Sequence, residues 1–89
     1  MNQAQELISK AQIEWLENQN GLVTEELLLK AAKLGSGHAA HELGVLYISG
    51  CGDLIASPKQ SKFWLEKSLE RGFEQTVASD PEWFKKSNT

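Results

Sequence analysis

The sequence has one cysteine, Cys51, and two prolines among its 89 residues. A lone cysteine forms no disulfide within its own chain, which excludes a disulfide-stapled secreted scaffold. The first residues lack the basic start and apolar stretch of a secretory signal peptide. No apolar run approaches the roughly 20 residues that a membrane-spanning helix needs. We therefore expect a cytoplasmic protein with no membrane partner.

A large excess of charge of one sign is also missing. Nine lysine and arginine residues stand against twelve aspartate and glutamate residues, so the net charge is -3. No basic patch with interleaved aromatic residues occurs, and we expect no nucleic-acid partner. The charges are unevenly spread, because residues 1–26 hold five glutamates and a single lysine. This acidic segment suits a basic partner and would speed its encounter electrostatically.

Strand-like alternation of apolar and polar residues is absent, and apolar residues recur instead at three- and four-residue spacing. We predict four helices in an all-α chain. The first ends near Asn18, the second spans about 24–34, and the third follows Ser36 as its cap. The fourth begins with Ser57 as its cap and Pro58 at its first helical position.

The helical periodicity also predicts which side of each helix is buried. The expected buried positions are Ala4, Leu7, Ile8, Ala11 and Trp15 on the first helix, Leu27, Leu28, Ala31 and Leu34 on the second, and Ala39, Ala40, Leu43, Gly44 and Tyr47 on the third. Glycine within a helix costs roughly 1 kcal/mol relative to alanine. We interpret Gly44 as a close packing contact with the fourth helix, where Phe63 and Trp64 supply the bulk. Gly50 and Gly52 are expected to adopt left-handed conformations that end the third helix.

A repeated pattern links two parts of the chain. The segments "LLLKAAKLG" and "FWLEKSLERG" share a lysine, a small residue and a final glycine at the same spacing. The stretch 39–72 resembles a Sel-one-like repeat, a relative of the tetratricopeptide repeat. The matching residues are Ala39, Leu43, Gly44, Tyr47, Gly50, Gly52, Trp64, Lys67, Ser68 and Gly72. The chain departs from the family pattern at Ser57, where an aspartate is usual, and by one extra residue in the loop after Gly52.

The resemblance implies a short α-solenoid of antiparallel helix pairs, with about one and a half to two repeats. We expect one domain over 1–89, composed of a degenerate first repeat over 2–35, a well-matched repeat over 36–72 and a C-terminal capping helix over 73–89. Within this cap, Trp83 and Phe84 either cover the open end of the stack or anchor a partner.

The resemblance also implies a protein-binding function, because the first helix of each pair lines the concave side of such stacks. The residues placed there are His38, His41, Val45, Ile48 and Ser49 from the third helix, and Gln5, Ser9, Gln12 and Ile13 from the first. Val45 and Ile48 are apolar residues outside the core stripe, which favours a protein partner. We expect a small inhibitor, immunity protein or regulator, with a basic enzyme or toxin as its target.

Two alternatives remain open. His38 and His41 are three residues apart on one helix and could share a metal ion, but a convincing site needs further ligands. Cys51 would lie about 15 Å from His41 along a continuous helix. No phosphate-binding loop, dinucleotide fingerprint or serine-hydrolase motif occurs, so we expect no catalytic residue, cofactor, resident metal or enzymatic activity. The alternatives are a small metal-dependent or enzymatic protein that uses His38 and His41, and a helical protein that self-associates.

Overall fold

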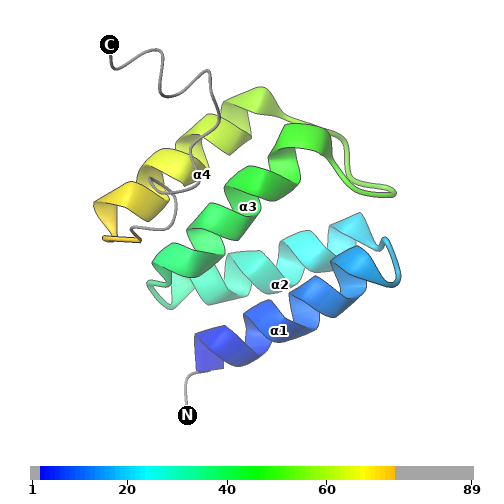
Figure 1. Ribbon diagram of the computed structural model, residues 1–89, viewed down its shortest axis with the longest axis horizontal. Helices are drawn as coiled ribbons and strands as arrows, with labels where there is room; N and C mark the ends of the chain where they lie inside the picture. The colour runs from blue at the N-terminus through cyan, green and yellow to red at the C-terminus, as the bar shows by residue number, and fades with distance from the viewer. Residues whose placement is uncertain (1–2, 74–89) are drawn as a thin grey trace.

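The computed structural model describes residues 3–73, which form four α-helices (Figure 1). These are α1 (Gln3–Leu16), α2 (Gly21–Lys33), α3 (Gly37–Ser49) and α4 (Pro58–Glu70). The described part of the chain contains no strand, and the prediction of an all-α fold is confirmed. None of these four helices is both long enough and apolar enough to cross a membrane. Trp83 and Phe84 of the predicted cap lie outside the described residues.

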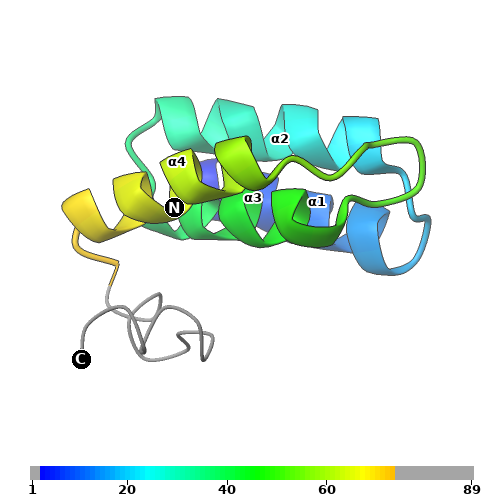
Figure 2. The ribbon, with the colours of Figure 1, turned by 90° about the horizontal axis from the view of Figure 1, so that it is seen from above.

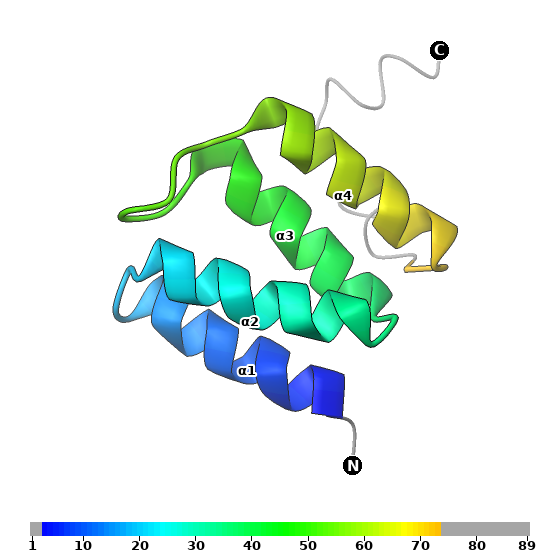
Figure 3. The same ribbon diagram turned by 180° about the vertical axis from the view of Figure 1, so that it is seen from behind.

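The helices form two antiparallel hairpins that pack side by side. Packing contacts join α1 to α2, α2 to α3 and α3 to α4 in chain order. Figure 1 shows α1 and α3 towards the viewer, and Figure 3 shows α2 in front of α1 from the opposite side. In Figure 2, α2 lies along one edge of the molecule, with α1 and α3 in a layer beside it. This is the arrangement of a short α-solenoid, in which α1 and α3 share one surface.

Serine side chains cap α3 and α4 where the sequence predicts. Ser36 Oγ accepts a hydrogen bond from the backbone N–H of Ala39 at 3.0 Å. Ser57 Oγ accepts one from the backbone N–H of Gln60 at 3.3 Å, and Pro58 is the first residue of α4. Each serine therefore satisfies one of the N–H groups that the first turn of a helix leaves without a partner.

The predicted start of α2 was wrong by three residues. The helix begins at Gly21, so Glu25 and Glu26 lie in its second turn and do not mark its beginning. Thr24, which was expected at the start, is fully buried inside the helix, and its hydroxyl donates to the Asn20 carbonyl at 2.8 Å. This bond back to the preceding turn satisfies the buried hydroxyl.

The core is built from alanines and branched apolar side chains of α1, α2 and α3. Its buried members are Ala4, Ile8, Ala11, Leu28, Ala31, Ala32, Ala39, Leu43, Leu46 and Tyr47. The predicted faces of α1 and α3 are confirmed, with Leu7 and Trp15 half-buried at the edge. Leu34 was predicted to be buried but is 55% exposed, because α2 ends at Lys33 and Leu34 already belongs to the turn.

Gly44 is the point of closest approach between α3 and α4, as predicted. A Cβ atom at this position would lie 2.5 Å from the side chain of Leu65. Ser61 Oγ also donates to the Gly44 carbonyl at 2.7 Å. The predicted partner Phe63 was wrong, because it is 51% exposed while Trp64 packs at the edge of the core. Phe63 lies two residues from Leu65, about 200° around the helix, so both cannot face α3.

The loop over residues 50–57 rests on the turn between α1 and α2. The backbone N–H of Leu22 donates to Asp53 Oδ1 at 3.0 Å. Gly52 has a φ of 54°, and a Cβ atom there would lie 2.0 Å from the Gln19 carbonyl oxygen. Gly50 also has a positive φ, 74°, but its ψ of -175° places it outside the left-handed helical region that was predicted. These contacts tie the two hairpins together at one end of the molecule.

Candidate functional site

Polar side chains join α1 to α3 across the surface that these helices share. Gln5 Oε1 lies 3.4 Å from His38 Nδ1, and Gln12 Nε2 donates to Glu42 Oε1 at 2.9 Å. The same Glu42 oxygen lies 3.7 Å from His38 Nε2. Three of the predicted binding residues thus take part in contacts within the chain. Glu42 was not among them, although its position four residues after His38 is the spacing at which helical side chains meet.

Phe73 lies over both histidines of the predicted site. Its ring centroid is 5.0 Å from that of His38, with the planes 6° apart, and 5.1 Å from that of His41, with the planes at 42°. Burial lowers the pKa of His41, the charge of Glu42 opposes this effect, and the charge of His38 adds to it. The chain itself therefore covers part of the site. No feature of the sequence pointed to this role of Phe73.

The other predicted binding residues differ in their access to solvent. Ser9, Ile48 and Ser49 are exposed, whereas Val45 is half-buried. Ile48 lies in the last turn of α3 and is 51% exposed. The exposed large apolar side chain of α3 is thus at its C-terminal end, away from the two histidines.

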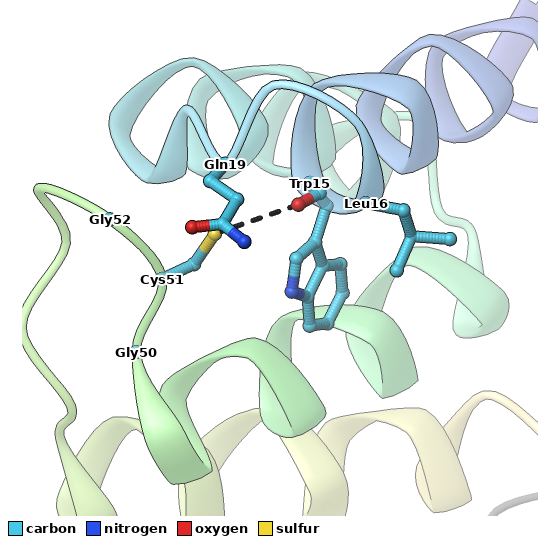
Figure 4. A pocket seen from close by; sticks show the side chains of 6 residues that line it. All are labelled: Trp15, Leu16, Gln19, Gly50, Cys51 and Gly52. Atoms are coloured by element: carbon cyan, nitrogen blue, oxygen red, sulfur yellow. Dashed lines mark hydrogen bonds between the residues drawn. The ribbon is translucent and has the colours of Figure 1, made fainter.

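An open hollow of about 340 Å³ lies at that end, where the gap between α1 and α3 meets the loop (Figure 4). The residues that line it are Trp15, Leu16, Gln19, Gly50, Cys51 and Gly52. The Trp15 ring lies between the two helices, and the Cys51 thiol donates a weak hydrogen bond to the Trp15 carbonyl at 3.9 Å. Leu16, on the rim, is 76% exposed. Sequence reasoning missed this hollow, because the loop that closes it comes from a distant part of the chain.

The two metal-binding candidates lie at one end of α3 and Cys51 follows its other end. Over residues 3–73, no group of three or more histidine, cysteine, aspartate and glutamate side chains is placed to hold a metal ion.

The chain thus folds as two stacked helical hairpins, with α1 and α3 on the same surface. No protein-family model matches the chain, and comparisons with curated proteins and with solved structures find no match either. The resemblance to Sel-one-like repeats therefore remains a prediction that rests on the motif residues.

Proposed function

We propose that this chain is a protein-binding module that holds a partner against the surface formed by α1 and α3, close to their C-terminal ends. The observation that supports this function is the exposure of a large apolar side chain in the last turn of each of these two helices, one of which, Leu16, also lines the open hollow. Leu16 is 76% exposed on α1, and Ile48 is 51% exposed on α3. Large apolar groups that stay in contact with water around a concavity are typical of sites that another protein covers.

The contacts between α1 and α3 support the same function. The Gln12–Glu42 hydrogen bond and the Gln5–His38 contact hold the two helices against each other without a partner. A surface held in place before binding loses less conformational entropy when the partner arrives. Binding would cover the partner's own surface, which suits the expected role as an inhibitor, immunity protein or regulator.

The test compares two variants whose altered residues are equally exposed. Ile48 on α3 and Phe63 on α4 are each 51% exposed. Tagged full-length wild type, Ile48→Glu and Phe63→Glu would be used to capture partners from the source cell, after circular dichroism shows that all three fold. Any captured protein would then be purified and titrated against the three chains by calorimetry.

We expect one protein to bind wild type and Phe63→Glu with equal affinity and to bind Ile48→Glu at least tenfold more weakly, since burying an isoleucine contributes about 1.5–3 kcal/mol. Equal loss in both variants, or full binding by Ile48→Glu, would overturn the placement on α1 and α3. Failure to find any purified partner that binds would overturn the function itself.

A further inference from the structure

Among residues 3–73, the exposed large apolar side chains are concentrated at one end of the molecule. Six of them belong to the last turns of α1 and α3, the first turn of α2 and the loop over 50–57, namely Ile13, Leu16, Leu22, Val23, Ile48 and Ile55. The other two, Leu34 and Phe63, lie at the end of α2 and on α4. The end where the α1–α2 turn meets the loop, which we call the turn end, therefore holds both the hollow and most of the exposed apolar surface.

The turn end is also acidic. Residues 11–29 and 50–57 carry five carboxylates and no lysine or arginine; the carboxylates are Glu14, Glu17, Glu25, Glu26 and Asp53. Lys30 pairs with Glu26 at 3.5 Å. Glu14 and Asp53 accept hydrogen bonds from the neutral groups Asn18 Nδ2 and Leu22 N–H, which leave their charges uncancelled.

The first lysine residues after the loop belong to α4. Lys59 and Lys62 lie in its first two turns. In Figure 4, α4 lies on the far side of α3 from the hollow between α1 and α3. None of the five carboxylates lines the hollow, but Glu17 directly follows the lining residue Leu16 and Asp53 directly follows the lining residue Gly52, so negative charge lies next to the lining along the chain.

We infer that the hollow receives an apolar side chain from a partner segment that carries lysine or arginine on the neighbouring positions. This inference rests on the proposed function and names the chemistry of the bound segment. At about 340 Å³ the hollow is at the lower limit of about 300–1,000 Å³ for ligand pockets, and it is open to one side. It fits one or two side chains of a protein, with Leu16 as the exposed apolar residue of its lining.

A basic partner is favoured over a second copy of this chain by charge. Two turn ends brought together would place carboxylates against carboxylates, and like charges in an interface disfavour association. A segment with lysine or arginine beside its apolar anchor instead pairs with Glu14, Glu17 and Asp53, and the attraction raises the rate of encounter.

The probe is a synthetic amphipathic peptide of leucine and lysine at helical spacing. Its two controls are the same peptide with glutamate in place of lysine, and with serine in place of leucine. Each would be titrated into the ¹⁵N-labelled full-length chain by NMR. We expect the leucine–lysine peptide alone to bind, to shift the backbone amides of Gln19, Cys51 and Gly52, and to bind more weakly as salt is raised from about 0.05 to 0.5 M.

Matched substitutions separate the contribution of the apolar contact at Leu16 from the contribution of the nearby carboxylates. Leu16→Gln should weaken binding of the leucine–lysine peptide about tenfold, whereas Leu34→Gln, at an exposed leucine outside the turn end, should change it less than about twofold. Glu17→Gln should reduce the salt dependence more than Glu6→Gln does, because Glu6 lies in the first turn of α1, at the opposite end.

Several outcomes would overturn the inference. These are no binding of the basic peptide, equal binding of the acidic peptide, shifts centred on His38 and His41, or a dimer that forms through the turn end without peptide. If a purified partner from the capture experiment binds through Ile48 while the basic peptide does not, the inference fails and the protein-binding function stands. If neither binds, both fail.

Discussion

The contact between Gly44 and Leu65 gives a sharp test of how α3 and α4 are held together. An alanine at position 44 would place its Cβ 2.5 Å from both Cγ and Cδ2 of Leu65 and 3.3 Å from its backbone nitrogen. These distances are too short for carbon atoms that are not bonded, so either Leu65 changes rotamer or the helices separate. The Ser61 hydrogen bond to the Gly44 carbonyl, at 2.7 Å, opposes separation because it is buried.

Two opposing effects set the magnitude for Gly44→Ala. Replacing a helical glycine with alanine stabilises a helix by about 1 kcal/mol. Adding a methyl group to a filled contact costs about 1–3 kcal/mol, and weakening a buried hydrogen bond adds about 1 kcal/mol. We therefore expect Gly44→Ala to lower the free energy of unfolding by about 1–3 kcal/mol, whereas helix propensity alone predicts an increase.

A double-mutant cycle with Leu65→Ala isolates the contact. Leu65→Ala removes the two atoms nearest to the Cβ of an alanine at position 44, and the same substitution should then raise the free energy of unfolding by about 1 kcal/mol. The coupling between the two positions is then about 2–4 kcal/mol. Urea unfolding followed by circular dichroism would measure all four proteins. An increase in stability for Gly44→Ala in the wild-type background, or the same change in both backgrounds, would refute the close contact.

Two further predictions concern the loop and the single tyrosine. Gly52→Ala should lower the free energy of unfolding roughly twice as much as Gly35→Ala. Both glycines have a positive φ, which costs an alanine about 1–2 kcal/mol, but of the two only Gly52 would bring the added Cβ against a backbone atom, the Gln19 oxygen. Equal losses of stability in urea unfolding would contradict this. Burial raises the pKa of Tyr47 above its ordinary value of 10.0, and the hydrogen bond to Glu25 and that residue's charge raise it further. The folded state therefore favours the neutral phenol, so its contribution to stability is complete below about pH 10 and declines at higher pH. Absorbance at 295 nm should show native ionisation well above pH 10, and Tyr47→Phe should remove the decline; a native midpoint near 10 would contradict it.

Local signals predicted the parts of the fold that are set by neighbours in the sequence. Ser36, and Ser57 followed by Pro58, mark helix starts through bonds that reach only three residues ahead. The start of α2 lacked such a signal, since Asn20 makes no side-chain capping bond. Its position depends instead on Asp53, which accepts from Leu22 across 31 residues of sequence. No pattern within the first hairpin contains that information.

The candidate site was predictable only in part, for the same reason. The family resemblance implied that Gln5, Gln12 and His38 share one surface of the first and third helices, and the structure brings them into contacts between α1 and α3. It did not reveal that Phe73 covers His38, because that contact depends on where the chain goes after α4. The hollow also escaped prediction, since its lining comes from the end of α1 and from the loop after α3.

Several residues that match the family motif make packing contacts or hydrogen bonds within this chain. Gly44 admits Leu65, Tyr47 donates its hydroxyl hydrogen bond to Glu25, and Gly52 passes against the Gln19 carbonyl. A side chain engaged in this way has little freedom to vary with the partner. Under the proposed function, partner choice depends on residues that the motif does not specify, and the exposed Leu16 and Ile48 are such residues. It follows that two chains with the same motif can bind different proteins, and that exchanging Leu16 for a polar residue should change binding without changing the fold.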